Sequence, residues 1–453
     1  HISFVDTTFV DQSTTNGVVH LSLTGEPSPA NATHIEWINS VFHNCSSENG
    51  GVFLLDTLVS TKMMVTNCNF ASCHADTEGG VLLIISGQTD AAVTLSVSDS
   101  SFDSNNANVG GVIYARLFGG TTLLTHTFTF DNVTATSNTA VGGGFLSVGS
   151  SNNGVAPLQA DVVITNSHFA DNVASMEGGV IYALLSSGFN RFSLHDTGST
   201  FDNNQASETG GAVLYAEFVS TVTPTVEILA VDSTFTSNKA NAGSGGVFYT
   251  KNVNLNVTLD QVRCANNLAN DTSGFGSVLH DTNSQRLDLT LSGSSFDGNK
   301  AFAGAFSHEA ASGISTPLML TATSSQFTNN VGSDGTVFVV QTSSPAGSTT
   351  PSTLNLIDCR FLGNVGSGNV LAAQFGGESA TITFTDTTME DNVGLPISVE
   401  ESLNGGSVSV NIDNLNARNN GGPNDVALLQ LNHPTAILTM TNMSVQDSLT
   451  SST

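Results

Sequence analysis

Two Cys–His pairs in the N-terminal part of the chain could do chemistry. His43 lies two residues before Cys45, and Cys73 is followed directly by His74. Thiolate and imidazole are the ligands that structural zinc prefers, so these four side chains could hold a metal if the fold brings them together. The alternative is a disulfide between Cys45 and Cys73 with both histidines at the surface. Whether the chain has a zinc site or a disulfide depends on how the surrounding elements place these four side chains.

Adjacent carboxylates occur at Glu390-Asp391 and Glu400-Glu401. Hydrolysis of a glycosidic bond needs two carboxyl groups across the bond, so such acids are candidates for a polysaccharide-degrading enzyme. The ten Lys and Arg residues are scattered along the chain and form no basic cleft for an acidic polysaccharide. A lyase or hydrolase could therefore act only on a neutral or weakly charged glycan. We expect these acids on solvated loops, and the sequence predicts no catalytic residue.

The charge balance excludes two classes of partner. Lys and Arg number 10 against 38 Asp and Glu, a formal net charge of −28 at pH 7. Nucleic acids and anionic membrane surfaces are bound through clustered basic residues, which this chain lacks. With 39% hydrophobic and only 11% charged residues, the composition is that of a folded chain. No apolar run approaches the length of a membrane span, so no membrane insertion is expected.

A Phe-x-x-Asn motif recurs along the chain about every 32 residues, a period typical of solenoids. Related copies carry Cys45 and Cys73 after Phe42 and Phe70, and Asn392 after Met389. The full copies are Phe102/Asn105, Phe169/Asn172, Phe201/Asn204, Phe235/Asn238, Phe296/Asn299, Phe327/Asn330 and Phe361/Asn364.

Two further features recur with the same period as the Phe-x-x-Asn motif and at a fixed distance from it. An Asn or Asp stands three residues before many of the Phe positions, which predicts a turn there, and we place the last members of this row at Asp413 and Asn442. Glycine doublets each begin a short β-branched or aromatic run, which predicts a turn followed by a strand. These doublets are Gly50-Gly51, Gly79-Gly80, Gly110-Gly111, Gly178-Gly179, Gly210-Gly211 and Gly245-Gly246.

These patterns predict an all-β fold, a right-handed parallel β-helix (β-solenoid) with about fourteen coils of roughly 32 residues. No amphipathic helix of ordinary length separates the units. We expect one domain over residues 1–453, regular in its N-terminal two thirds and degenerate after Cys264, where the glycine doublets decay.

The motifs Phe-x-x-Asn and Gly-Gly-[Ala/Val]-[Ile/Leu/Val/Phe], repeated in phase, resemble the repeats of the chlamydial polymorphic outer membrane proteins and related right-handed β-helix surface proteins. The resemblance covers nearly the whole chain. It implies a surface-exposed or secreted β-helix, with the adhesion typical of that family.

Stacking of coils favours the disulfide. Cys45 and Cys73 replace the Asn of Phe-x-x-Asn in adjacent coils, so their Cα atoms should lie about 5 Å apart. Cys68, on the same coil as Cys73, is the rival partner. The Asp and Asn row could bind calcium, and otherwise no cofactor is expected. N-glycosylation sequons begin at Asn31, Asn44, Asn132, Asn256, Asn270 and Asn442 and permit a secreted glycoprotein.

We therefore predict a non-catalytic, extracellular or cell-surface structural or adhesive protein, a building block of a filament, appendage or matrix. A polysaccharide-degrading enzyme and a glycan-binding adhesin are the alternatives. The expected partners are further solenoid segments or copies of the chain stacked end to end. Strands such as Val180-Ile181-Tyr182 are apolar on both faces, so both faces must be covered. Either loops of the chain or another molecule covers the outer face, and the second option predicts lateral protein or glycan partners.

Overall fold

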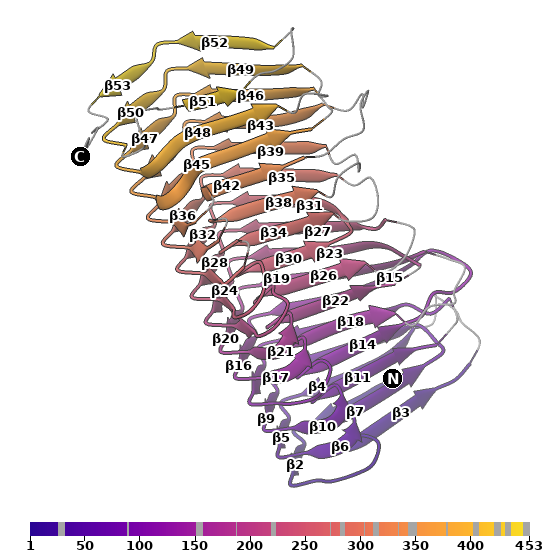
Figure 1. Ribbon diagram of the computed structural model, residues 1–453. Helices are drawn as coiled ribbons and strands as arrows, with labels where there is room; N and C mark the ends of the chain where they lie inside the picture. Colours follow the sequence, from indigo (N-terminus) through magenta and orange to yellow (C-terminus); the bar gives the residue numbers. More distant parts are fainter. Residues whose placement is uncertain are drawn as a thin grey trace. The chain divides into compact units, whose positions relative to one another are not determined.

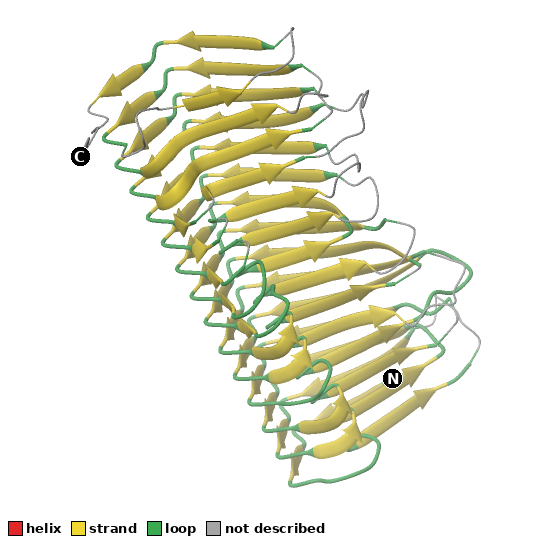
Figure 2. Ribbon diagram, viewed as in Figure 1, coloured by secondary structure: helices red, strands yellow, loops and turns green. Residues whose placement is uncertain are grey.

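The structure is a computed structural model. It describes residues 1–25, 32–87, 90–150, 157–186, 188–218, 223–271, 273–280, 286–302, 304–310, 317–333, 335–342, 351–376, 379–401, 407–420, 427–430 and 436–446. Within these ranges every regular element is a β-strand (Figures 1 and 2). No helix long and apolar enough to cross a membrane occurs in this part of the chain.

The chain forms a parallel β-solenoid with about 32 residues per turn, which confirms the predicted all-β solenoid and its period, whereas the right-handed sense stays a prediction. In the described part of the chain, each coil before the last contributes one strand to each of three parallel sheets. A long strand of sheet 1 is followed by a three-residue strand of sheet 2, and a strand of sheet 3 completes the coil. Most coils add a short strand just before sheet 3. The chain divides into two compact units, unit 1 (His1–Leu229 and Asn238–Asn241) and unit 2 (Ala230–Ser237 and Ala242–Thr453).

Unit 1 holds the strands whose motifs are most regular. In order along sheet 1 they are β1 (Ile2–Val5), β4 (Thr33–Ile38), β8 (Thr61–Thr66), β12 (Val93–Ser98), β15 (Leu124–Asp131), β19 (Leu158–Thr165) and β23 (Phe189–Thr197). Sheet 2 holds β2 (Thr8–Val10), β5 (Val41–His43), β9 (Asn69–Ala71), β13 (Ser101–Asp103), β16 (Thr134–Thr136), β20 (His168–Ala170) and β24 (Thr200–Asp202). Sheet 3 holds β3 (Val19–Leu23), β7 (Phe53–Thr57), β11 (Leu82–Ser86), β14 (Ile113–Leu117), β18 (Leu146–Ser150), β22 (Ile181–Leu185) and β26 (Leu214–Phe218). The short strands before sheet 3 are β6 (Ser46–Asn49), β10 (His74–Glu78), β17 (Thr139–Gly142), β21 (Val173–Glu177), β25 (Gln205–Ala206) and β29 (Lys239–Ala240).

Unit 2 repeats this order, and β27 (Thr225–Val231) spans the boundary in the sequence. Its sheet 1 holds β31 (Asn254–Asp260), β35 (Leu287–Ser292), β39 (Leu318–Thr323), β43 (Ser352–Ile357), β46 (Ala380–Thr385), β49 (Val408–Asp413) and β52 (Ile437–Thr441). Sheet 2 holds β28 (Thr234–Thr236), β32 (Arg263–Ala265), β36 (Ser295–Asp297), β40 (Gln326–Thr328), β44 (Arg360–Leu362), β47 (Thr388–Glu390), β50 (Asn416–Arg418) and β53 (Ser444–Gln446). Sheet 3 holds β30 (Phe248–Lys251), β34 (Gly276–His280), β38 (Phe306–Ala310), β42 (Gly335–Gln341), β45 (Val365–Phe375), β48 (Val393–Glu401) and β51 (Ala427–Gln430). The short strands are β33 (Leu268–Ala269), β37 (Lys300–Ala301) and β41 (Val331–Gly332).

The Phe positions of the repeat point into the coils and stack on one another. In unit 1 the ring centroids of Phe42 and Phe70 lie 4.8 Å apart, and those of Phe70 and Phe102 lie 4.9 Å apart. In unit 2, Phe296, Phe327 and Phe361 follow with spacings of 5.1 and 5.0 Å. Each ring therefore contacts its equivalents in the neighbouring coils, as parallel pairing in register requires.

The register differs by one residue from the sequence alignment at two places. Ile181 pairs with Leu214, so Gly211, with φ of 66°, takes the role of Gly178, and Ala212 takes that of the second glycine. The row of turn residues passes through Asn414, with φ of 56°, and not through Asp413. Here the Phe position is Ala417, which pairs with Met389.

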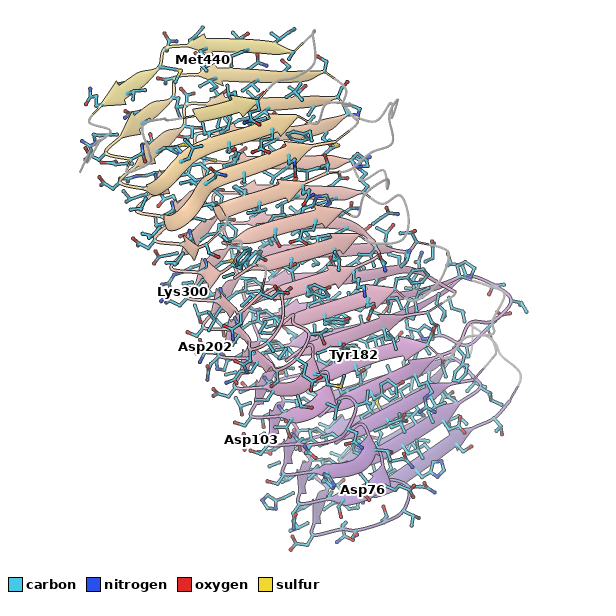
Figure 3. The ribbon with its side chains drawn as sticks, viewed as in Figure 1. Asp76, Asp103, Tyr182, Asp202, Lys300 and Met440 are labelled. Atoms are coloured by element: carbon cyan, nitrogen blue, oxygen red, sulfur yellow. The ribbon has the colours of Figure 1, made fainter. Side chains whose placement is uncertain are left out.

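The outer face of the sheet 3 strands is covered within the chain. Alternation along these strands makes Leu54, Leu83, Ser147 and Tyr215 outward-facing, yet they are only 8%, 2%, 1% and 2% exposed. Tyr182 lies on the same face, where burial raises its pKa (Figure 3). Most of this face is therefore buried within the chain, Tyr114 and Tyr182 are half-buried, and lateral partners stay a prediction.

Candidate functional site: a polar groove on unit 1

The turns between sheets 1 and 2 hold one residue per coil in the left-handed backbone conformation, a polar residue in most coils and glycine at Gly198 and Gly293. In four consecutive coils this residue is Asn39, Asn67, Asp99 or Asn132, with φ between 50° and 52°. Asn and Asp tolerate this conformation better than other residues with a Cβ atom, which explains why the repeat places them here. All four side chains are exposed.

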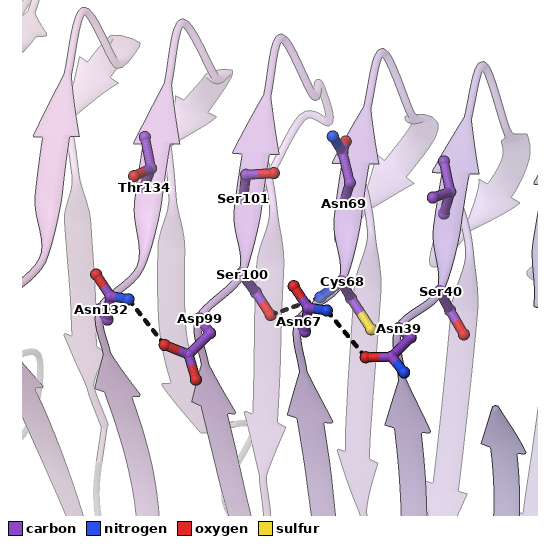
Figure 4. A pocket seen from close by; sticks show the side chains of 11 residues that line it. Asn39, Ser40, Asn67, Cys68, Asn69, Asp99, Ser100, Ser101, Asn132 and Thr134 are labelled. Atoms are coloured by element: carbon purple, nitrogen blue, oxygen red, sulfur yellow. Dashed lines mark hydrogen bonds between the residues drawn. The ribbon is translucent and has the colours of Figure 1, made fainter. Parts of the chain in front are cut away.

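These four residues form one wall of an open groove with a volume of about 530 Å³. The other wall is the first residue of each sheet 2 strand, namely Val41, Asn69, Ser101 and Thr134. Ser40, Cys68 and Ser100 lie between the walls. Figure 4 shows both rows, with one side chain of each row per coil. The groove therefore crosses the strands and follows the direction in which the coils stack.

Hydrogen bonds hold the groove walls in place. Asn67 Nδ2 donates to Asn39 Oδ1 at 2.9 Å, and Asn132 Nδ2 donates to Asp99 Oδ1 at 2.8 Å (Figure 4). Beneath them, Ser100 Oγ donates to the Ser98 carbonyl at 2.7 Å and accepts from the Cys68 amide at 3.0 Å. The walls are therefore linked from coil to coil.

The Asn of Phe-x-x-Asn points inward and is unavailable to a ligand. Asn105, Asn138, Asn172 and Asn204 are each 0% exposed. Asn172 Nδ2 donates to the Ala135 carbonyl at 2.9 Å and to Asn204 Oδ1 at 3.0 Å, and the other members repeat this pattern. Unit 2 has the same ladder at Asn299, Asn330, Asn364 and Asn392. This ladder therefore satisfies buried backbone groups.

The proposed zinc ligands are not brought together. Cys45 and Cys73 occupy the inward Asn positions and are buried, whereas His43 and His74 are exposed. Imidazole nitrogens of His74 contact Asn106 and Asp76, each at 3.0 Å. No group of three or more His, Cys, Asp or Glu with metal-binding geometry occurs among the described residues.

The predicted Cys45–Cys73 disulfide is not formed in this structure, where all five cysteines are free thiols. The hydrogen bond between the two thiols lowers the pKa of Cys45 and raises that of Cys73. The rival Cys68 belongs to a different row, where its amide bonds Ser100 Oγ, and burial raises its pKa. The pairing of Cys45 with Cys73 stays a prediction.

Glu390 and Asp391 are engaged in structural contacts, and neither acid pair lines the groove. Glu390 is only 13% exposed at its side chain and forms ion pairs with Arg360, at 3.5 Å, and with Arg418. Asp391 Oδ1 accepts from Asn419 Nδ2 at 3.1 Å. Glu400 and Glu401 lie at the end of β48 in unit 2. Glu390 is thus held by arginines of both neighbouring strands of its sheet.

The described sequons fall into two structural classes. The amide nitrogens of Asn44, Asn132 and Asn442 already donate to Asp11, Asp99 and Asp413 at 2.7, 2.8 and 3.1 Å. Asn256 is exposed on β31, and Asn270 is exposed after β33. The sequon at Asn31 lies outside the described residues. The structure therefore places one sequon, that of Asn132, in the wall of the groove.

A second hollow, in unit 2, is apolar. Leu268, Phe302, Val331 and Val365 contribute to its lining, its volume is about 560 Å³, and Phe302 is 56% exposed. Sequence reasoning missed both hollows. The apolar hollow could have been found from a Val directly after the buried Asn, as at Asn330-Val331. The groove could have been found from a polar residue two positions after the turn Asn or Asp, as at Asn67 and Asn69.

Comparisons with known proteins give one short match. Residues 198–216 match the Chlamydia polymorphic membrane protein repeat, a segment that contains Phe201, Asn204 and the glycines at 210 and 211. No curated protein and no solved structure matches the chain. The protein is thus a parallel β-solenoid in which residues 198–216 are similar to the repeat of the chlamydial polymorphic membrane proteins.

Proposed function

We propose that the protein is a non-catalytic structural or adhesive solenoid of an extracellular or cell-surface setting, a building block of a filament, appendage or matrix. The observation that carries the proposal is the polymorphic membrane protein repeat at residues 198–216, in phase with coils of the same design in both units. A surface repeat protein needs a rigid scaffold that presents side chains at regular intervals.

The interior supports a mechanical role. Amide ladders, stacked Phe rings and in-register parallel sheets give each coil the same contacts with its neighbours. The predicted disulfide between Cys45 and Cys73 would add a covalent link between two adjacent coils in an oxidising compartment. Calcium and other cofactors play no part in the proposal.

Copies of the chain or further solenoid segments are the proposed end-to-end partners. Strand β52 pairs with β49 and exposes Ile437, Leu438 and Met440 by 57%, 46% and 42%. A strand of this kind has the backbone groups and apolar side chains that a further parallel strand would cover.

Electron microscopy of the purified chain tests the structural proposal. Filaments whose width matches one solenoid would support it, and substitution of Leu438 by Lys should then shorten them. Beads coated with the protein test the adhesive alternative by their retention on cells or matrix. Chains that neither polymerise nor retain beads would contradict both roles. Release of reducing ends from a neutral polysaccharide would contradict the non-catalytic assignment.

A further inference from the structure

The polar groove on unit 1 has the composition of a site for a hydroxyl-rich, uncharged ligand. Its walls consist mainly of amides and hydroxyls, which both donate and accept hydrogen bonds. Asp99 is its one carboxylate, Val41 its one exposed aliphatic side chain, and no Lys or Arg lines it. An anionic ligand would find no counter-charge there and would be repelled by the acidic chain.

A peptide that adds to a sheet edge does not fit this site. Strands β5, β9 and β13 are each paired on both sides, so their backbone groups are already used. Recognition of an extended peptide by main-chain hydrogen bonds requires an unpaired strand edge. The groove can therefore recognise a ligand only through side chains.

The spacing of the groove walls suits a chain-like ligand. Each of the four coils of the groove contributes one Asn or Asp and one residue of the opposite wall, and coils of a parallel sheet lie about 4.8 Å apart. This spacing is close to the length of one pyranose unit in an extended glycan. A glycan running along the stacking direction would meet an equivalent set of amides and hydroxyls at each sugar.

One wall is also fixed before the ligand arrives. The bonds from Asn67 to Asn39 and from Asn132 to Asp99 restrict the side chains on one wall. Side chains that are already ordered lose less conformational entropy when they bind. On the other wall, Asn69 and Thr134 are exposed and Ser101 is half-buried, so their polar groups are accessible to a ligand in the groove.

We propose that this groove binds an extended neutral glycan, with the amides of Asn39, Asn67 and Asn132 on one side and Asn69, Ser101 and Thr134 on the other. This inference rests on the proposed function, which is non-catalytic. It adds to the adhesive role the class of ligand that the protein binds. The ligand class is a polymer of uncharged hexose or N-acetylhexosamine units. It binds intact, with no bond made or broken.

The test uses the whole chain produced in a host without N-glycosylation, because Asn132-Val133-Thr134 is a sequon inside the groove. Binding is measured by calorimetry with neutral hexasaccharides derived from cellulose, chitin, mannan and laminarin, and with an oligogalacturonate as the anionic probe. We expect at least one neutral hexasaccharide to bind and the oligogalacturonate not to bind.

A matched pair of variants locates the site. Asn69→Arg fills the groove, whereas Gln326→Arg makes the same charge change at the first residue of β40, the equivalent exposed position in unit 2. Both should keep the melting temperature of the wild type. We expect Asn69→Arg to weaken binding at least about tenfold and Gln326→Arg to leave it unchanged.

Two results would overturn the proposal: no binding of any neutral hexasaccharide by the wild type, or equal binding by the two variants. Chromatography of the recovered sugar distinguishes failure of the groove proposal from failure of the proposed non-catalytic function. A hexasaccharide that binds in the groove and is recovered as shorter fragments would refute the non-catalytic role while leaving the site in place.

Discussion

The buried Asn of the repeat is a backbone-binding residue. Its amide reaches the carbonyl of the Phe position in the preceding coil, and its oxygen accepts from the next Asn down the ladder and from that residue's backbone amide. Buried polar groups cost free energy when they lose their partners. An Asn at this position thus satisfies, with one side chain, groups that the turn leaves outside the sheet ladders.

Substitution of Asn172 by Ala should lower the free energy of unfolding by about 3 kcal/mol, because the Ala135 carbonyl and the donors of Asn138 lose their partner. Urea denaturation measures the loss. Exposed Asn69 supplies the control, since Asn69→Ala should change stability by less than about 0.5 kcal/mol. Equal effects of the two substitutions would show that the ladder does not stabilise the coil.

His126 gives the fold a pH dependence. Its side chain is 0% exposed, Nδ1 accepts from the Val93 amide at 3.2 Å, and Nε2 has no partner among the described residues. Burial lowers the pKa of His126 to about 4, below the value of about 6.5 for an unfolded chain. The unfolded state therefore binds a proton that the folded state excludes between these pH values, and stability falls as the pH falls.

Between pH 7 and about pH 5 this residue should remove roughly 2 kcal/mol of stability. His126→Gln should be less sensitive to acid by that amount, whereas exposed His168→Gln should behave as the wild type. Denaturation curves at both pH values measure the difference. An unchanged pH dependence in His126→Gln would mean that another group carries it.

At the scale of the elements, the left-handed glycine before the regular sheet 3 strands, such as Gly178 or Gly211, is a requirement of the coil. Gly178 has φ of 64°, and a Cβ atom there would lie 2.2 Å from the Ile181 carbonyl oxygen, which is backbone and cannot move aside. Gly293 also has a positive φ, 54°, but its Cβ would only touch Gln261 at 3.6 Å. Substituting alanine for each glycine therefore distinguishes two contributions to the loss of stability: the strain of a positive φ at both positions, and a steric clash at Gly178 only.

Gly293→Ala should cost about 1 to 2 kcal/mol, the strain of the left-handed conformation alone. Gly178→Ala should cost at least about 3 kcal/mol, because the clash adds to the same strain. Thermal unfolding of both variants gives the comparison. Similar losses would show that the strand after the doublet can shift to accept a methyl group.

The sequence predicts the strands and their period because each coil repeats the same contacts. Phe201 and Asn204 could be aligned with Phe169 and Asn172, and the structure pairs Phe169 with Phe201. The sequence alignment gave the wrong register for the Gly210-Gly211 doublet, because one residue more separates Asn204 from Gly211 than separates Asn172 from Gly178. A one-residue insertion in a turn leaves no mark on strand periodicity.

The groove could not be derived from single motifs. Its walls join residues of four coils, such as Asn39 and Asn132, which lie far apart in the sequence. The alternation of wall residues is visible only when the turn conformation is known, because a left-handed Asn points its side chain differently from a strand residue. The zinc hypothesis failed for the same reason, since position 45 turns inward while position 43 faces outward.

At the scale of the whole molecule, charge opposes the association that exposed apolar residues favour. Unit 2 exposes Phe302, Val331, Val365 and Val393 by 56%, 38%, 44% and 47%. The net charge of −28 at pH 7 repels other copies, and this repulsion vanishes near the isoelectric point of about 4.3. At pH 7, salt shortens the screening length from about 30 Å at 0.01 M to about 3 Å at 1 M.

Light scattering should therefore show association that is weakest at pH 7 in low salt and that rises both towards pH 4.3 and with added salt. The double variant Phe302→Ser/Val365→Thr should reduce this rise, because it removes apolar area from the hollow in unit 2. Met64→Thr removes an isolated apolar side chain of unit 1 that is 44% exposed and should have little effect. If the two variants scatter alike, the apolar hollow does not drive association, and the exposed apolar side chains of β52 become the surface to block next.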